Sequence, residues 1–376
     1  MSTREGLRAW VEVRGGALRR NLGRVRQAAG TEVPVIPMVK ADGYGLGMED
    51  VVDCVDSLTP WAYGVATIAE GLRLRRHGVQ RPVLVLTPAI PERYGDAVAV
   101  GLTLSLSDLE AVERLDRAAE EAERDVDFHV EIDTGMGRAG FAWQDAAAWG
   151  EGVVARAGPR LNWQGCFTHF HSADTDDDST REQWERLAAA LSKVAAIPTS
   201  CMVHVCNSGG ALRGPEFAAD AVRPGIFLYG GRVGAGLPDP EPVASVRARV
   251  TFLRDANPGT TVGYGTTYTA EREERWATLG IGYGDGLPRS LGNSGHALLA
   301  GVRVPIIGRI SMDTTVVDIT RIENVSVGDV ATLIGRDGDA TILLDEVAGL
   351  AGTIGYEILT GLTPRLPRIW IDDDGS

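Results

Sequence analysis

The lysines of this chain are the first residues whose type suggests chemistry. Lys40 and Lys193 are the only lysines among 37 basic residues, and the rest are arginine. Lys193 lies in an amphipathic helical pattern, whereas Lys40 ends the apolar run VPVIPMVK (33–40). A desolvated lysine amine can form a Schiff base, which a guanidinium cannot do because it stays protonated. Lys40 is therefore a candidate for amine chemistry. The alternative is a compositional bias toward arginine, and residue type alone does not separate the two.

Polar side chains also follow several other short apolar runs. These side chains are Tyr44, Arg138, Thr168, His169, Asn207 and Ser208, and Arg223 stands at the start of the eighth run. If the runs are the strands of a (β/α)8 barrel, their carboxyl ends meet at one face, where such barrels build their active sites. We therefore expect these side chains to lie near Lys40.

Small residues in two of the same segments favour a phosphate site. Ser208-Gly209-Gly210 and Gly225-Ile226 offer a hydroxyl and accessible backbone N–H groups near the seventh and eighth runs. Barrels of this type commonly bind phosphate there. A lysine on one side and phosphate donors across the mouth suit pyridoxal phosphate.

Two other kinds of site are weighed against this interpretation. HFHSADTDDD (169–178) could hold a metal, but His169 and His171 alternate along a strand and point to opposite faces, so we expect none. Ser208 lacks the G-x-S-x-G context of a serine hydrolase.

The elements that must position these residues change character near residue 240. Eight apolar runs alternate with helical patterns over residues 35–40, 63–67, 83–87, 102–106, 127–132, 164–169, 202–206 and 226–229. They predict a (β/α)8 TIM-type barrel. A doubly wound sheet is the alternative, but GYGLG (43–47) does not match its phosphate loop. After PDPEP (238–242), valine-rich and threonine-rich runs with frequent glycine predict a mainly-β domain, with a short helix over 345–353. We expect domains over 1–240 and 241–376.

Composition excludes several classes of protein. The net charge of −14 disfavours nucleic acid as a partner, and no run is long enough to span a membrane. The amino-terminal MSTREGLRAW does not resemble a signal peptide, so a cytoplasmic location is expected. The four cysteines show no C-x-x-C pair and are interpreted as reduced thiols.

Nine motifs, taken together and in order, resemble the alanine racemase family. They are PMVKADGYGLG (37–47), EIDTGMGRAG (131–140), FTHF (167–170), CNSGG (206–210), VRPGIFLYG (222–230), VGYGTTYT (262–269), GIGYGDGLPR (280–289), GRISMD (308–313) and TIGYE (353–357). This resemblance extends over nearly the full chain, including the β domain.

The resemblance implies a role for each matched residue. Lys40 would hold pyridoxal 5'-phosphate as a Schiff base and act as one catalytic base, while Tyr264 would be the opposing base, supplied by the partner subunit of a homodimer. Arg223 would face the pyridine nitrogen, and His169 would lie beside the ring. The phosphate ligands implied are Tyr44, Ser208, Gly225, Ile226 and Tyr356. The substrate side implied comprises Arg138, Met312, Asp313 and Tyr283.

The implied reaction interconverts L- and D-alanine and supplies D-alanine for peptidoglycan. Two bases must flank a planar carbanion, and the cofactor supplies the electron sink. A racemase for serine or another small amino acid, and a non-catalytic pyridoxal-phosphate carrier, remain as alternatives.

Three positions depart from the family pattern. Many relatives carry a carbamylated lysine where Glu131 stands, and we expect Glu131 to pair with Arg138 by a charge-assisted hydrogen bond. Leu46 replaces a frequent histidine, and His171 adds a polar group after FTHF.

Overall fold

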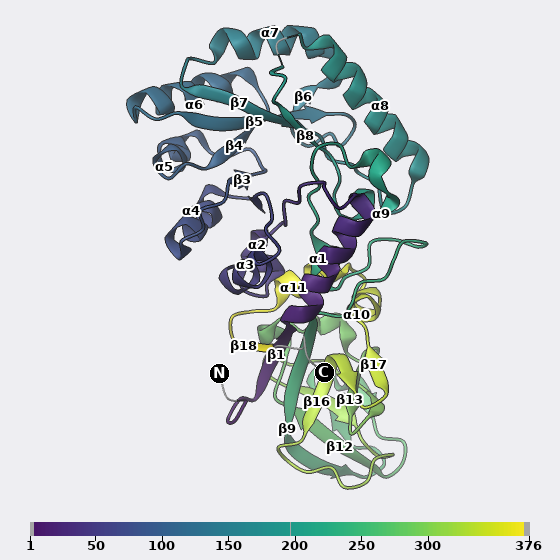
Figure 1. Cartoon of the computed structure of the whole chain (residues 1–376). Helices are drawn as coiled ribbons and strands as arrows, with labels where there is room; N and C mark the ends of the chain where they lie inside the picture. The colour runs from purple at the N-terminus through teal and green to yellow at the C-terminus, as the bar shows by residue number, and fades with distance from the viewer. Residues whose placement is uncertain (1–3, 196, 372–376) are drawn as a thin grey trace.

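A computed structural model describes residues 4–195 and 197–371. The chain forms a curled β/α body, at the top of Figure 1, and a strand-rich body below it. Within the described residues no helix is both long and apolar enough to cross a membrane.

The upper body is a ring of parallel strands. Its strands are β2 (Tyr63–Val65), β3 (Val83–Val85), β4 (Thr103–Leu106), β5 (Val126–Asp133), β7 (Leu161–Phe167) and β8 (Met202–His204), and each pairs in parallel with the next. Isolated parallel bridges complete the ring at Val35–Val222, Met38–Gly64 and His204–Ala221. The predicted barrel is thus confirmed.

The predicted eighth strand over 226–229 is wrong. These residues form the 3-10 helix η4 (Ile226–Tyr229), and the eighth strand position lies at Ala221 and Val222. The chain turns after Pro224, and the Leu228 N–H donates to the Gly225 carbonyl at 2.9 Å. All four residues of η4 are buried, and a short buried apolar run does not distinguish a strand from a helical turn.

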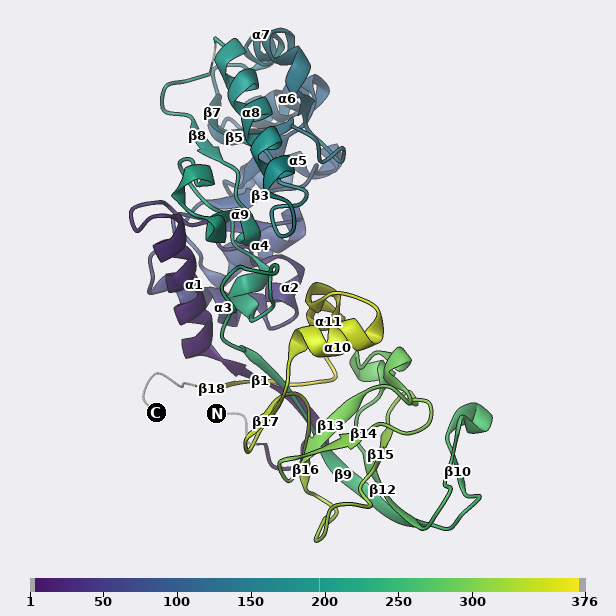
Figure 2. The same ribbon diagram turned by 90° about the vertical axis from the view of Figure 1, so that its right-hand side faces the viewer.

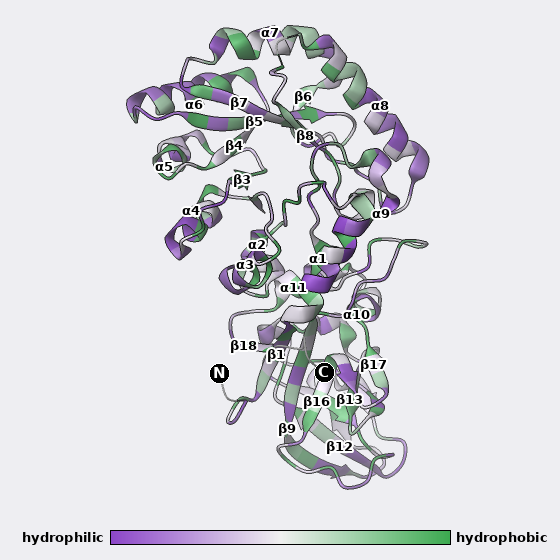
Figure 3. Cartoon of the chain, in the orientation of Figure 1, coloured by the Kyte–Doolittle hydropathy of each residue, from purple (hydrophilic) through white to green (hydrophobic). Residues whose placement is uncertain are grey.

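Helices surround the ring on its outer side. They are α1 (Gly15–Ala29), α3 (Met48–Asp56), α4 (Ile68–His77), α5 (Tyr94–Ala99), α6 (Leu109–Glu121), α7 (Ala146–Arg156), α8 (Asp177–Lys193) and α9 (Ser208–Arg213). Helix α4 begins with a capping box in which Thr67 and Glu70 bind each other's backbone N–H groups. Figure 3 shows hydrophilic residues along α4 and α8, as expected of helices with one face in water.

The lower body is a mainly antiparallel sheet of order β14-β13-β16-β9-β1-β18, to which β12, β15 and β17 are added. The bounds are β1 (Ala9–Arg14), β9 (Ala244–Ala256), β12 (Glu274–Leu279), β13 (His296–Leu299), β14 (Val302–Pro305), β15 (Thr315–Asp318), β16 (Val330–Asp337), β17 (Ala340–Ile342) and β18 (Arg368–Ile371). A separate ribbon joins β10 (Thr261–Val262) to β11 (Tyr268–Thr269). Helices α10 (Leu344–Ala351) and α11 (Gly355–Gly361) lie between this sheet and the barrel (Figure 2).

Strand β1 lies in the second sheet, although its residues fall within the expected 1–240 domain. It pairs antiparallel with β9 and parallel with β18. The boundary near residue 240 stays a prediction. Strand β1 precedes this boundary in the sequence but lies in the sheet formed by residues that follow it.

One hydrophobic core continues through both bodies. It includes Leu18 and Phe128 in the barrel and Val246 and Leu333 in the β domain. At the junction, a Cβ added to Gly45 would lie 2.3 Å from the Leu359 carbonyl oxygen of α11. The β domain is therefore packed directly against the loop that carries Lys40.

Candidate active site

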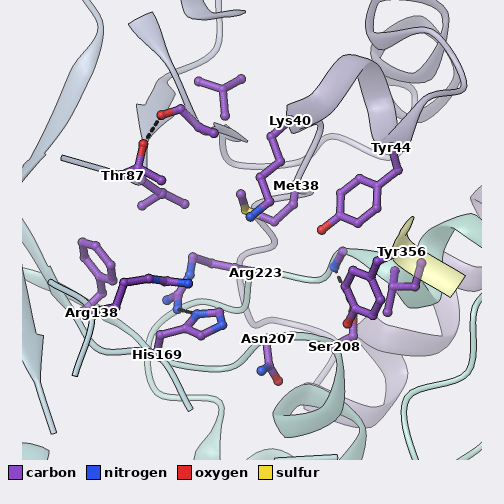
Figure 4. Close-up of a pocket in the computed structure, with 16 residues that line it drawn as sticks. Met38, Lys40, Tyr44, Thr87, Arg138, His169, Asn207, Ser208, Arg223 and Tyr356 are labelled. Carbon is purple, nitrogen blue, oxygen red and sulfur yellow. Dashed lines mark hydrogen bonds between the residues drawn. The ribbon is translucent and has the colours of Figure 1, made fainter. Parts of the chain in front are cut away.

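A cavity opens at the carboxyl ends of the barrel strands. The predicted residues that line it are Lys40, Tyr44, Arg138, His169, Ser208, Arg223, Gly225, Ile226 and Tyr356. Figure 4 shows Tyr44, Ser208 and Tyr356 at one side, Arg138, His169 and Arg223 at the other, and Lys40 pointing between them. Residues far apart in the chain thus converge as the strand-end argument predicts.

Lys40 begins an unusual left-handed turn, α2 (Lys40–Tyr44). Ala41, Asp42 and Tyr44 have φ of 51°, 55° and 54°, in the region that disfavours residues with a Cβ. The turn is held by Glu70, whose Oε1 accepts a hydrogen bond from the Ala41 N–H at 2.7 Å. Its Oε2 accepts from the Ala66 N–H at 2.8 Å and the Thr67 N–H at 3.1 Å. One carboxylate therefore fixes the Lys40 turn to the start of α4.

The surroundings of Lys40 favour its neutral amine. Burial lowers the pKa of Lys40, the positive charges of Arg138 and Arg223 lower it further, and the Glu70 carboxylate partly opposes them. A lysine whose pKa is lowered in this way is suited to act as a nucleophile or base.

Hydroxyl groups gather at one end of the cavity. Burial raises the pKa of Tyr44 well above its usual value and that of Tyr356 to about 12, so both remain hydrogen-bond donors. The Ser208 hydroxyl accepts from the Gly225 N–H at 2.8 Å. A Cβ added to Gly225 would lie 2.2 Å from the Tyr44 hydroxyl oxygen, so only glycine permits this close approach. Such a cluster suits an anion with several oxygens.

Arg223 is a buried cation at the opposite end. Its Nη1 donates to His204 Nδ1 at 2.7 Å and to the His204 carbonyl at 2.6 Å. Its Nη2 donates to the carbonyls of Thr168 and Val205 at 2.8 and 3.0 Å and lies 3.3 Å from His169 Nδ1. Burial lowers the pKa of Arg223 to about 10, which still leaves it charged at neutral pH.

His169 is neutral in this environment. Burial, followed by the charges of Arg223, Arg138 and Lys40, lowers its pKa to about 3. Its imidazole therefore presents a hydrogen-bonding edge and a flat ring to the cavity without adding charge.

The expected pair between Glu131 and Arg138 is wrong. In the described chain no hydrogen bond or ion pair joins them, and Glu131 accepts from the Ser107 hydroxyl at 3.0 Å. Glu131 is buried in β5, whereas Arg138 lies in an exposed turn beyond that strand. Burial raises the pKa of Glu131, while the Ser107 hydrogen bond and the charges of Arg138 and Arg223 oppose this shift.

Several lining residues were not predicted as site residues. They are Met38, Val65, Ala66, Leu86, Thr87 and Phe167, whereas Asn207, which also lines the cavity, was expected near Lys40. Thr87 ends a predicted strand, as Lys40 does, so the strand-end argument could have included it. Its hydroxyl donates to the Ala66 carbonyl.

Four of the β-domain residues predicted for the site lie elsewhere, whereas Tyr356 lines the cavity. Tyr264, Met312, Tyr283 and Asp313 do not line the cavity of their own chain. Tyr264 is 69% exposed and Met312 is 52% exposed. Tyr264 lies in the 3-10 helix η5 (Tyr264–Thr266), flanked by Gly263 and Gly265, both with φ of 73°.

Metal-binding chemistry has no support in the described ranges. No group of three or more histidine, cysteine, aspartate or glutamate side chains there is arranged to hold a metal ion.

Comparison with known proteins gives one consistent result. Residues 13–233 match the family model of the alanine racemase N-terminal domain, and residues 243–370 match that of the C-terminal domain. The chain is 35% identical to the alanine racemase of Halothermothrix orenii, over 96% of each chain.

Solved structures agree with the family models. An alanine racemase from Bacillus anthracis with bound L-Ala-P has a TM-score of 0.91 and 31% identity, over 99% of this chain and 97% of that one. An alanine racemase from Bartonella henselae with covalently bound pyridoxal phosphate has a TM-score of 0.88 and 28% identity, over 97% of this chain and 100% of that one. Because both family models match and the similarity covers nearly the whole chain, this protein belongs to the alanine racemase family.

Proposed function

We propose that this protein interconverts L- and D-alanine with pyridoxal phosphate bound at Lys40. The observation that carries the proposal is the convergence of a lysine of lowered pKa, a cluster of hydroxyls and a buried arginine on one cavity. The relatives named as alanine racemases, and the structure with bound L-Ala-P, support alanine as the substrate.

The residues present fit the cofactor. Tyr44, Ser208, Tyr356 and the backbone of Gly225 and Ile226 would hold the phosphate. Arg223 lines the cavity, and its Nε forms no hydrogen bond within the described residues, so this N–H is available to the pyridine nitrogen. When bound, the cofactor supplies an aldehyde for the Lys40 amine and an electron sink for the substrate α-carbon.

The residues that line the cavity then have defined roles. The Lys40 amine, whose pKa is lowered, would take a proton from one face of the substrate α-carbon and return a proton to that face. His169 would lie beside the cofactor ring, and the guanidinium of Arg223 would disfavour a proton on the pyridine nitrogen because like charges repel. Arg138 has no carboxylate partner among the described residues, so it is available to the substrate carboxylate.

The second base comes from a second copy of the chain. Tyr264 is too exposed, and absent from its own cavity, to serve the site in cis. The turns that carry Tyr283 and Met312 are joined by hydrogen bonds from the Tyr283 N–H to Ser311 O at 3.0 Å and from the Gly284 N–H to Met312 O at 2.8 Å. A homodimer in which this face covers the partner's cavity would place Tyr264 opposite Lys40.

Neither alternative function gains support from the structure. A non-catalytic carrier would not require the C-terminal domain, which matches its family model over residues 243–370. A cytoplasmic location stays a prediction, as does a preference for alanine over serine.

A racemisation assay on a panel of L-amino acids tests the proposal. We expect alanine to be the best substrate, and borohydride reduction to attach the cofactor to Lys40, as detected by peptide mass. Lys40→Ala should abolish both signals, whereas Tyr264→Phe should retain the label and lose turnover. A labelled Lys40 without racemisation of any amino acid would contradict the proposed reaction, and an unlabelled chain would contradict the proposed cofactor link.

A further inference from the structure

A chain of hydrogen bonds leads from Arg223 through the interior of the barrel, away from the cavity. His204 Nδ1 lies 2.7 Å from Arg223 Nη1, and His204 Nε2 lies 2.7 Å from His129 Nδ1. His129 Nε2 lies 3.3 Å from Gln164 Oε1, and Gln164 Nε2 donates to Asp127 Oδ2 at 2.9 Å. Asp127 stands at the amino-terminal end of β5, so the chain runs from one end of the barrel to the other.

The two ends of this chain determine its direction. The guanidinium of Arg223 can only donate, so His204 Nδ1 must accept, and its proton must lie on Nε2. His129 Nδ1 then accepts from His204, which leaves the proton of His129 on Nε2 facing Gln164. At the far end the carboxylate of Asp127 can only accept, which orients the Gln164 amide with its oxygen toward His129. Every group donates in the same direction, from Arg223 to Asp127.

Burial keeps the two histidines in a single charge state. His129 is 1% exposed and His204 is 0% exposed. Burial lowers the pKa of His129 to about 4 and that of His204 well below its usual value, and the charge of Arg223 acts in the same sense. Both rings are neutral at neutral pH, so each has one donor and one acceptor nitrogen.

The backbone is shaped to accommodate the chain. The register of β5 against β7 shifts between Phe128–Trp163 and His129–Gly165, which leaves Gln164 as an extra residue at a β-bulge. A Cβ added to Gly165 would lie 2.5 Å from the His129 ring, so glycine makes room for that imidazole. Asp127 and His129 lie on the same face of β5 because side chains alternate along a strand. Strands β5, β7 and β8 lie side by side in the ring (Figure 1).

We propose that Asp127 and Gln164 are positioning residues for Arg223, which act by fixing His129 and His204 in the Nε2–H tautomer. With the opposite tautomer, His204 Nδ1–H would face a guanidinium N–H, and two buried donors would oppose each other. The inference rests on the proposed function only in assuming that Arg223 faces the cofactor.

The tautomers can be measured without cofactor or substrate. The chain has six histidines, so ¹⁵N-histidine labelling with long-range ¹H–¹⁵N correlation gives few signals, which single substitutions assign. We expect both His129 and His204 to show an unprotonated Nδ1 and a protonated Nε2 in the wild-type protein. A protonated Nδ1 in either ring would overturn the proposal, whatever reaction the protein catalyses.

Substitutions at the far end test the effect on Arg223. Gln164→Leu removes the acceptor of His129, so we expect mixed tautomers and about tenfold weaker binding of pyridoxal phosphate. Asp127→Leu should act in the same direction, whereas Asp127→Asn retains an oxygen for Gln164 Nε2 and should preserve both properties.

Asn162→Ala is the matched control. Asn162 Nδ2 also donates to Asp127, at 2.6 Å, but it is exposed and lies off the chain of donors. We expect wild-type tautomers and wild-type cofactor affinity in this variant. If folded Gln164→Leu protein, verified by circular dichroism, matches the Asn162→Ala control in both measurements, the positioning role is wrong.

Discussion

The cavity of the barrel and the outer face of the β domain differ in how completely one chain builds them. Around the cavity, two polar groups are buried and paired: Arg223 donates to three backbone carbonyls, and Ser208 accepts from Gly225. On the β domain, Tyr264 and Met312 are mostly exposed. Tyr264 does not line the cavity of its own chain, whereas Tyr356 of α11 does. We therefore expect one chain to bind the cofactor by itself and catalysis to require a second surface.

The largest expected effect is the recovery of racemisation activity when two inactive variants, one changed in each region, are mixed. Lys40→Ala and Tyr264→Phe chains should each lose racemisation. In a mixed dimer, one site would combine the intact Lys40 of one chain with the intact Tyr264 of the other. After co-refolding in equal amounts, about a quarter of wild-type activity should return, because half of the dimers are mixed and each has one complete site.

The same mixture can contradict the proposal that the two regions form one shared site. If no activity returns although native mass spectrometry detects mixed dimers, the site is not shared between subunits. If the Tyr264→Phe variant alone keeps full activity, the β-domain face has another role.

Two glycine substitutions, one in the cavity and one in the β domain, should affect different properties, namely cofactor affinity and turnover. Gly225→Ala places a Cβ against the Tyr44 hydroxyl, so cofactor affinity should fall by about 5-fold to 150-fold, which corresponds to about 1 to 3 kcal/mol of overpacking. Gly265→Ala strains a residue with φ of 73° beside Tyr264, so turnover should fall while cofactor affinity stays unchanged. Fluorescence titration with pyridoxal phosphate and a racemisation assay measure the two properties.

Gly95→Ala serves as the control for both variants. Gly95 lies in helix α5, and a Cβ there would meet no atom within 4 Å. A loss of cofactor affinity in Gly265→Ala as large as that in Gly225→Ala would show that the two regions are not separate.

Sequence reasoning succeeded where a local pattern implies a shared location. Lys40, His169 and Ser208 each lie near the end of a predicted strand, and closing the barrel brings such ends together. Arg223 was expected at the start of the predicted eighth strand, and it follows the observed strand position at Val222. The family motifs added Tyr356, which reaches the cavity from α11 in the other domain.

It failed where the outcome depends on long-range contacts. Nothing local in AWVEVR (9–14) indicates that β1 pairs with β9 and β18. The buried run over 226–229 was predicted to be a strand, but it forms a helical turn. Burial of every residue removes the periodicity that distinguishes the two. The hydrogen-bond partner of Glu131 depends on which side chain lies within hydrogen-bonding distance in the fold. The hydrogen bonds of His129 depend on a β-bulge for which the sequence contains no signal.

Acid should destabilise the barrel through its buried histidines. His129 and His204 have pKa values below those of the unfolded chain, so below about pH 6.5 the unfolded state binds protons that the folded state excludes. Stability is therefore fully present above pH 6.5 and falls with decreasing pH toward about 4. Between pH 7 and 5 the free energy of unfolding should decrease by about 1 to 2 kcal/mol for each histidine.

Urea denaturation at several pH values measures this slope. His129→Gln should reduce the slope, whereas His171→Gln, in an exposed segment after the barrel strand, should leave it unchanged. A slope that is equal in all three proteins would show that His129 does not contribute to the difference between folded and unfolded protonation.

The smallest expected effect compares one carboxylate from each region. Glu70 accepts from three backbone N–H groups, those of Ala41, Ala66 and Thr67. Asp313 instead forms an ion pair with Arg365 at 2.6 Å, and both side chains are exposed. In Glu70→Gln the amide has only one oxygen, so at least one N–H loses its acceptor, and stability should fall by about 1 kcal/mol.

Asp313→Asn should change stability by less than about 0.5 kcal/mol, because exposed ion pairs contribute little. The two variants also differ in what they do to Lys40. Glu70→Gln loosens the left-handed turn over 41–44, so association of pyridoxal phosphate should slow, whereas Asp313→Asn leaves that turn intact and should keep the wild-type rate. Urea denaturation and stopped-flow absorbance measure the two effects. If Glu70→Gln binds the cofactor at the wild-type rate despite its loss of stability, the Glu70 carboxylate caps α4 but does not position Lys40. The turn would then be held by its own backbone hydrogen bonds, such as that from the Gly45 N–H to the Ala41 carbonyl at 2.8 Å.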